Sequence, residues 1–194
     1  MIEDRHLLYI VGEPGSGKST LVEAMTAGVP AAEHRVGPVR WLEMATAPPV
    51  VELGARREEF SGTDALAMNV QPAMVNWLAG TGAGEHVLGE GDRLANLKFF
   101  RAVWDAGWLL HVACLEASPL TLAQRRSSRA LLLGKPEQSA SWVKGRQTKL
   151  RNVLHGLPPN VVSYHRHDDG ATADVVRQLV SIDPVAAILQ GGAA

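Results

Sequence analysis

One glycine-rich run restricts the fold more than any other feature of the sequence, because it fits the pattern G-x-x-x-x-G-K-[S/T] in full. Residues 7–11, an apolar segment typical of a β-strand, lead into it, and residues 21–25, compatible with a helix, follow it. Glycines let the backbone wrap around an anion, so that successive N–H groups point at a phosphate at a helix N-terminus. The motif therefore predicts a strand–loop–helix unit that binds a nucleoside triphosphate, with a loop made of Gly12, Glu13, Pro14, Gly15, Ser16, Gly17, Lys18, Ser19 and Thr20.

Two residues at the end of the loop carry the expected chemistry. Lys18 is predicted to bridge the β- and γ-phosphates, and Ser19 is predicted to be a ligand of Mg²⁺. No Asn-Lys-x-Asp motif occurs, so the chain is not expected to be a regulatory GTPase, and it is too short for a helicase-type motor. The remaining class is a compact phosphoryl transferase that uses ATP and Mg²⁺.

Hydrophobic patterning predicts an α/β fold. Short β-rich runs near residues 6–11, 39–44, 86–89, 108–115 and 160–164 alternate with helical segments, which is typical of a mainly parallel sheet covered on both faces. Residues 93–105 repeat apolar side chains at helical spacing, and Pro72 suits the first turn of another helix. Residues 45–63 show no period and are predicted to be a long ordered loop that carries function. We expect one domain over residues 1–194.

Charge is distributed unevenly along the chain. With 19 basic and 20 acidic residues, the formal net charge of −1 argues against a protein that coats nucleic acid. Residues 121–155, however, contain eight basic residues and one acid, which suits a polyanion. No apolar run is long enough to span a membrane, and the single Cys114 excludes an internal disulfide, so we expect a cytoplasmic protein.

The sequence resembles the nucleoside and nucleotide kinases of the P-loop superfamily. Besides the loop, the resemblance rests on Asp92-Arg93 after the third expected strand, on the polar 45–63 segment, and on three arginines after the fourth strand, Arg125, Arg126 and Arg129. It implies a three-layer fold with a five-stranded parallel sheet, an acceptor-binding region at 45–80 and a basic lid at 121–155. It also implies that the Asp92 carboxylate lies near the acceptor, that Arg93 supports the phosphates, and that Arg125 and Arg129 close over them.

The third strand offers two carboxylates, Glu90 and Asp92. Either one can accept the proton of an attacking hydroxyl or hold the water shell of Mg²⁺. Asp92 is the favoured base because it adjoins Arg93, and Glu90 is the favoured carboxylate on the Mg²⁺ side. A structural alternative is that Asp92 caps the 93–105 helix.

A narrower resemblance points to small bacteriophage kinases that act on hypermodified DNA. Their similarity lies in Glu52–Arg57, Phe60–Asp64, Gly89–Asn96 and Trp142–Arg146. It implies ATP-dependent phosphorylation of the 5-hydroxymethyl group of 5-hydroxymethyluracil in DNA, inside the infected host cell. The alternatives are a thymidylate-like deoxynucleoside monophosphate kinase, with a free deoxynucleotide as acceptor, and a nucleotide-dependent DNA-binding module.

If DNA is the acceptor, further residues are expected to bind it. Arg56 and Arg57 can neutralise a phosphate, Phe60 can stack on a pyrimidine, and Asp64 can hydrogen-bond the edge of the base. In the basic region the candidates are Trp142, Lys144 and Arg146, of which Trp142 can stack on a base or pack under the lid. Thr63 is favoured as a helix cap, and the pair His165 and His167 offers too few ligands for a metal site.

Overall fold

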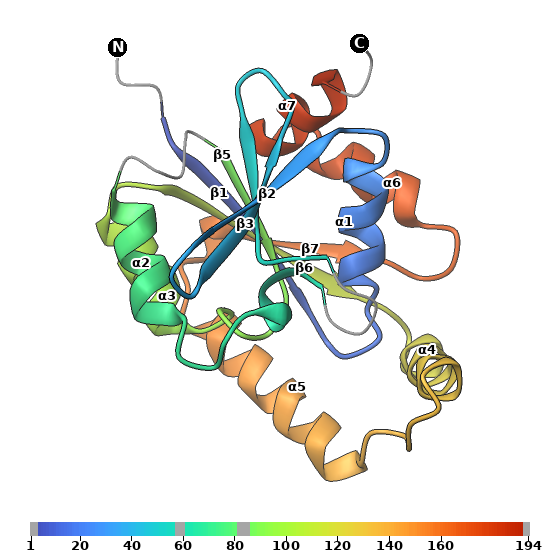
Figure 1. Cartoon of the computed structure of the whole chain (residues 1–194). Helices are drawn as coiled ribbons and strands as arrows, with labels where there is room; N and C mark the ends of the chain where they lie inside the picture. The colour runs from blue at the N-terminus through green and yellow to red at the C-terminus, as the bar shows by residue number, and fades with distance from the viewer. Residues whose placement is uncertain (1–3, 57–60, 81–85, 192–194) are drawn as a thin grey trace.

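A computed structural model describes residues 4–56, 61–80 and 86–191. It contains one twisted sheet with helices on both faces and two helices that extend from its edge (Figure 1). The strands are β1 (His6–Gly12), β2 (Ala31–Val36), β3 (Val39–Met44), β4 (Val50–Leu53), β5 (His86–Glu90), β6 (Leu109–Glu116) and β7 (Val162–Arg166). The helices within these ranges are α1 (Lys18–Thr26), α2 (Gln71–Ala79), α3 (Leu97–Asp105), α4 (Pro119–Leu132), α5 (Ala140–His155), α6 (Thr172–Leu179) and α7 (Asp183–Gly191), with short 3₁₀ turns η1 (Gly62–Ala65) and η2 (Pro159–Val161).

The sheet is mixed, and its order is β2-β3-β4-β5-β1-β6-β7. Five neighbouring strands, β4, β5, β1, β6 and β7, run parallel, as expected for this fold, but β2 and β3 pair antiparallel at one edge. The prediction that residues 39–44 form a parallel strand was wrong. Only two residues join β2 to β3, and a connection that short permits only an antiparallel pair.

The parallel strand missing from the prediction, β4, lies inside the segment expected to be a loop. Val50, Val51 and Leu53 of this strand are buried, and Val50 and Val51 pair with His86 and Val87 of β5. Four residues between two prolines and a glycine are too short to show a period of two. Within the described part of the segment 45–63, only Val50–Leu53 belongs to the sheet.

The alternation of side chains along β1 builds two cores. Leu8 and Ile10 face α1, α6 and α7, whereas Leu7, Tyr9 and Val11 face α2, α3 and α5 (Figure 1). Both faces are apolar because parallel strands are covered on both sides. In the described ranges no helix is long and apolar enough to cross a membrane.

Helix α3 begins later than expected. Its N-cap is Asn96, whose side chain accepts a hydrogen bond from the backbone N–H of Phe99 at 3.0 Å. Asp92 lies four residues before this cap, so the alternative that it caps the helix was wrong. Residues 91–94 instead form a turn that leaves their side chains at the carboxyl edge of the sheet, where the loop after β1 also lies.

Candidate active site

The phosphate loop is shaped by its glycines. Gly17 has φ +86° and caps α1, and a Cβ on Gly12 would lie 2.4 Å from Ser16 Oγ. A Cβ on Gly15 would lie 2.8 Å from the carbonyl oxygen of Leu122, which fixes the loop close to α4. The hydroxyl of Ser16 is buried and has no hydrogen-bond partner among the described residues. A tight loop at a helix N-terminus with an unsatisfied inner polar group fits the phosphates of a nucleotide.

Lys18 folds back over this loop. Its Nζ donates to the carbonyl oxygens of Gly12 at 3.0 Å and Glu13 at 3.2 Å. Burial lowers the pKa of Lys18, and the charge of Glu90 opposes that effect. A bound phosphate would add negative charge beside this half-buried ammonium and raise its pKa again.

Ser19, Ser61 and Glu90 form an oxygen cluster beside the lysine. The Ser19 and Ser61 hydroxyls donate to Glu90 Oε1 at 3.1 and 2.9 Å, and the two hydroxyl oxygens are 2.9 Å apart. Glu90 is 3% exposed, and burial raises its pKa, against the opposing effects of Lys18 and the Ser61 hydrogen bond.

The cluster suits Mg²⁺, which binds through one or two protein oxygens and keeps waters and nucleotide phosphates as its other ligands. The described residues hold no group of three His, Cys, Asp or Glu side chains that could bind a metal ion by themselves. Ser19 and Glu90, the two residues predicted for the metal, thus lie together. Ser61, which lies inside the Phe60–Asp64 segment and was not predicted for the metal, lies with them.

Asp64 holds the turn after β5. Its Oδ1 accepts hydrogen bonds from the backbone N–H groups of Asp92 at 2.8 Å and Arg93 at 2.9 Å, and Arg93 Nη2 donates to its carbonyl oxygen at 3.1 Å. The oxygen that was expected to contact a base therefore binds the backbone. Arg93 is directed to η1 and the neighbouring Met68.

Tyr9 and Thr63 support the same turn from within the core. The Tyr9 hydroxyl lies 2.8 Å from Thr63 Oγ1 and donates to the Gly91 carbonyl at 3.1 Å, while Thr63 Oγ1 lies 2.8 Å from the Glu90 carbonyl. Both side chains are fully buried. The prediction that Thr63 caps a helix was wrong, since its hydroxyl bridges β1 and β5. Tyr9 was missed, although a tyrosine inside a buried strand must find a partner for its hydroxyl.

Helix α5 covers this turn with cations. Arg146 forms an ion pair with the Asp92 carboxylate, and Lys149 Nζ lies 3.0 Å from Asp92 Oδ1 and 2.7 Å from its carbonyl oxygen. Gln147, the residue after Arg146 on the same helix, donates to Glu13 Oε2 at 2.7 Å. The helix thus spans from the phosphate loop to Asp92, which the sequence did not indicate.

The arginines of α4 contact the phosphate loop and its support. Arg125 donates to the carbonyl of His167 at 2.9 Å and pairs with Asp169 at 2.9 Å, and Arg126 donates to the carbonyl of Pro14 at 3.1 Å. Arg129 lies near enough to Lys18 to contribute to lowering its pKa. His167 is buried with Nδ1 2.7 Å from the Ser16 carbonyl, so it supports the loop.

The residues predicted to bind the acceptor do not lie together in the structure. Arg56 donates to Thr26 at 2.7 Å and pairs with Glu52 at 2.8 Å, which ties it to the far end of α1. Arg57 and Phe60 lie outside the described residues. Trp142 is 40% exposed, with the Arg146 guanidinium 5.0 Å from its ring, and Lys144 is exposed on the same helix.

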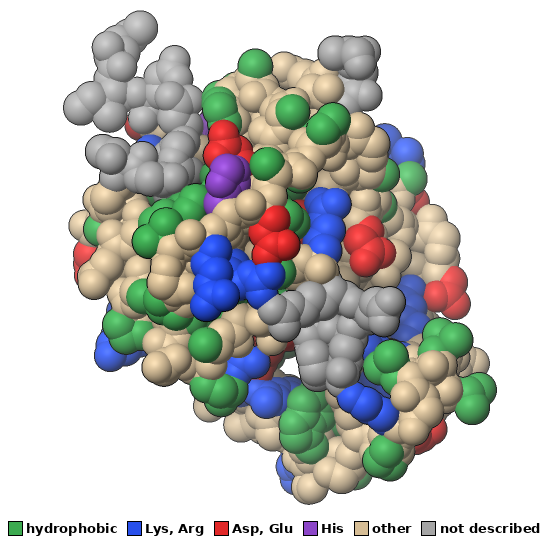
Figure 2. Space-filling model, viewed as in Figure 1, with side chains coloured by type: hydrophobic (Ala, Val, Ile, Leu, Met, Phe, Trp, Pro, Cys, Tyr) green, Lys and Arg blue, Asp and Glu red, His purple; other side chains and the backbone are tan. Residues whose placement is uncertain are grey.

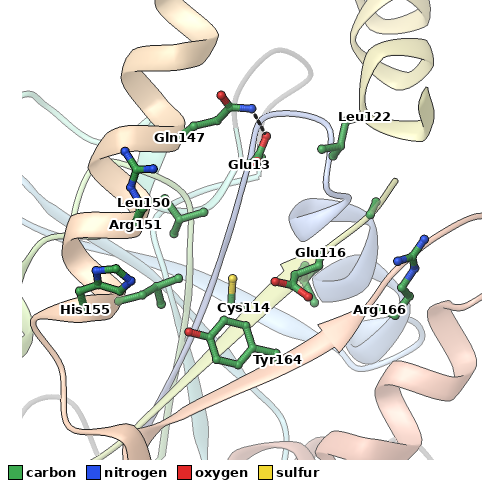
Figure 3. A pocket seen from close by; sticks show the side chains of 13 residues that line it. Glu13, Cys114, Glu116, Leu122, Gln147, Leu150, Arg151, His155, Tyr164 and Arg166 are labelled. Atoms are coloured by element: carbon green, nitrogen blue, oxygen red, sulfur yellow. Dashed lines mark hydrogen bonds between the residues drawn. The ribbon is translucent and has the colours of Figure 1, made fainter. Parts of the chain in front are cut away.

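A pocket of about 390 Å³, lined in part by Glu13 of the phosphate loop and Gln147 of α5, opens beside the loop (Figure 3). Arg151 and His155 extend from α5 on one side, Tyr164 of β7 lies opposite, and Cys114 of β6 lies between them. Burial raises the pKa of Cys114 to about 12, so its thiol is inert at neutral pH. None of the residues predicted for the acceptor lines this pocket.

Comparison with known proteins agrees with the loop and its surroundings. The curated proteins contain no match to the chain. Residues 3–182 match the model of a family described as P-loop Nucleotide Kinase3, and the match includes the phosphate loop, the turn after β5 and both helices of the basic region. The chain therefore belongs to the P-loop Nucleotide Kinase3 family.

Proposed function

We propose that the chain is a kinase that uses ATP and Mg²⁺ to phosphorylate the 5-hydroxymethyl group of 5-hydroxymethyluracil in DNA. Membership of a nucleotide kinase family supports phosphoryl transfer in general. The observation that carries the DNA acceptor is the position of α5, which brings Arg146 and Lys149 into contact with Asp92 and leaves Lys144 exposed on the same helix. A helix rich in cations next to the acceptor carboxylate suits a substrate with a phosphate backbone.

The donor is held by the phosphate loop. Lys18 binds the β- and γ-phosphates, and Ser19 and Glu90 hold Mg²⁺, which neutralises charge on the same phosphates when bound. Arg125 and Arg126 already contact the loop through its carbonyls or its support, so their guanidinium groups lie next to the loop that would hold the phosphates. This arrangement stabilises the charge of the transferring group.

The acceptor hydroxyl is oriented by Asp92. Its carboxylate accepts the proton as the hydroxyl oxygen bonds to the γ-phosphorus and the bond to the β-phosphate oxygen breaks. Arg146 and Lys149 occupy this carboxylate in the structure. Backbone phosphates of the acceptor would attract both cations away and leave Asp92 facing the hydroxyl.

A transfer assay with matched acceptors tests the proposal. Radiolabelled ATP is offered with oligonucleotides that contain 5-hydroxymethyluracil or thymine at one position, and with free deoxynucleoside monophosphates. Label in the hydroxymethylated oligonucleotide alone is expected, and Lys18→Ala should abolish it. Label only in a free monophosphate would overturn the proposal in favour of the thymidylate-like kinase. Absence of transfer, with DNA affinity changed by ATP, would favour a DNA-binding module.

A further inference from the structure

Helices α4 and α5 form an arm that stands away from the sheet (Figure 1). Leu122 is the one buried residue of α4 in the described structure, and Val153, near the other end of the hairpin, is the one buried residue of α5. We define the arm as residues 123–147. Since it packs little apolar surface against the body, the fold does not need the side chains at its end.

The end of the arm is nevertheless apolar. Leu131 is 84% exposed, Leu132 is 86% exposed, and Leu133 continues the run at 38%. Figure 2 shows hydrophobic side chains gathered on this projection, next to Lys and Arg side chains. Single exposed leucines are ordinary, but three in succession at the end of a projecting hairpin indicate a surface that contacts something apolar.

The rest of the arm is cationic. It contains Arg125, Arg126, Arg129, Lys135, Lys144 and Arg146, against Glu137 as its single acid. A groove of about 390 Å³ between the two helices has Arg126 and Lys144 in its wall. Charge of this sign complements a polyanion, whereas the apolar end does not.

Duplex DNA offers both surfaces at once, an anionic backbone around an apolar stack of bases. Kinase chemistry on a base requires that the base leave this stack, and proteins that unstack duplexes insert apolar side chains between base steps. Ten residues of helix separate Leu122 from Leu132, so the end lies about 15 Å beyond the residue that touches the phosphate loop. That span lets the arm reach the duplex while an extruded base lies beside Asp92 and the donor phosphates lie at the loop.

We propose that Leu131, Leu132 and Leu133 form a wedge that enters the base stack of duplex DNA and helps to extrude the base to be phosphorylated. This inference rests on the proposed DNA kinase function. The wedge acts on the duplex and not on the chemistry. It is therefore dispensable when the target base is already unstacked.

The test compares a duplex with a single strand. Both contain 5-hydroxymethyluracil at the same position, and the duplex carries 2-aminopurine beside it, whose fluorescence rises on unstacking. In Leu131→Ser/Leu132→Ser, kcat/KM on the duplex should fall at least tenfold and the fluorescence rise should be lost, while kcat/KM on the single strand stays within twofold. Leu131→Met/Leu132→Met keeps the apolar volume and should behave as the wild type. Val36→Ser, an exposed residue at the β2–β3 turn, controls for loss of surface apolar area.

Each other result has a definite meaning. Equal loss on both DNAs would overturn the wedge and indicate that the leucines pack on the body when the arm closes. Unchanged duplex activity and fluorescence in the serine variant would also overturn the wedge. So would binding of the wild type to anionic vesicles, if the serine variant loses that binding while it keeps duplex activity. Transfer to neither DNA by the wild type would refute the proposed function itself, and the wedge with it.

Discussion

Replacing Asp64 by alanine removes the acceptor of two backbone hydrogen bonds in the turn after β5. Hydrogen bonds to a charged group contribute about 1.5 kcal/mol each at the lower end of their range, which suits a half-buried carboxylate. The loss of both predicts a decrease of about 3 kcal/mol in the free energy of unfolding. In a chain of this length, this corresponds to a fall in Tm of roughly 6–12 °C.

The same substitution should impair catalysis by releasing the turn. Asp92 and Arg93 lose their fixed backbone, and misplacement by about 1 Å can cost roughly 100-fold in rate, so we expect kcat to fall by about that factor. Asp64→Asn keeps an oxygen at the Oδ1 position and is the matched control. It should lose only about 1 kcal/mol and recover most of kcat.

Thermal unfolding by circular dichroism and steady-state transfer kinetics measure these two effects. The reasoning is refuted if Asp64→Ala unfolds within 2 °C of the wild type and raises only the KM of the acceptor. That result would mean that Asp64 contacts the substrate, as the sequence alone predicted.

Three further changes test other parts of the site. Burial raises the pKa of Glu90, so its charged form opposes folding at pH values above the ordinary carboxyl range. Glu90→Gln should therefore raise Tm at pH 7, and this gain should disappear towards pH 4.5 and below, where both side chains are neutral. The same variant should abolish Mg²⁺-dependent transfer. An unchanged Tm at pH 7 would contradict this. Gly62 has φ +57°, and a Cβ there would lie 2.5 Å from Glu90 Oε1. Gly62→Ala should therefore destabilise the protein by about 1–3 kcal/mol and raise the Mg²⁺ concentration needed for half-maximal rate. An unaltered Mg²⁺ titration would contradict this prediction. Lys149→Gln should change stability by under about 1 kcal/mol, because the ion pair of Lys149 with Asp92 is partly exposed. It should lower the slope of log K for DNA binding against log salt concentration by about 1. A slope equal to that of the wild type would exclude a phosphate contact.

Local signals were sufficient for the phosphate loop. Gly12, Gly15 and Gly17 are required by backbone angles and close approaches within or next to the loop itself, so their spacing already specifies the conformation. The strands at β1 and β3 were predicted within a residue, because β1 is an almost unbroken apolar run and β3 is rich in residues that favour strands, such as Val39 and Trp41. The short β4 was missed because four residues carry too little pattern, and its place in the sheet depends on β5.

On the acceptor side of the site, local sequence patterns were not sufficient. The sequence identified Glu90 and Asp92 as a pair of carboxylates but left their roles open. Their surroundings differ in the fold: Glu90 is buried with two serine hydroxyls, and Asp92 lies under the cations of α5. Arg146 and Asp92 form their ion pair across 54 positions of sequence, and no local pattern encodes such a pair.

The sequence by itself determined the nucleotide-binding unit, the α/β class and the concentration of basic charge in residues 121–155, because each depends on neighbouring residues. Only the tertiary structure decided what Asp64, Tyr9 and Thr63 do. Their hydrogen-bond partners come from strands and turns distant in the chain, and a buried polar group must bond to whatever the fold brings beside it. The projection of the arm was likewise a tertiary outcome, since exposure of its leucines depends on where the sheet ends.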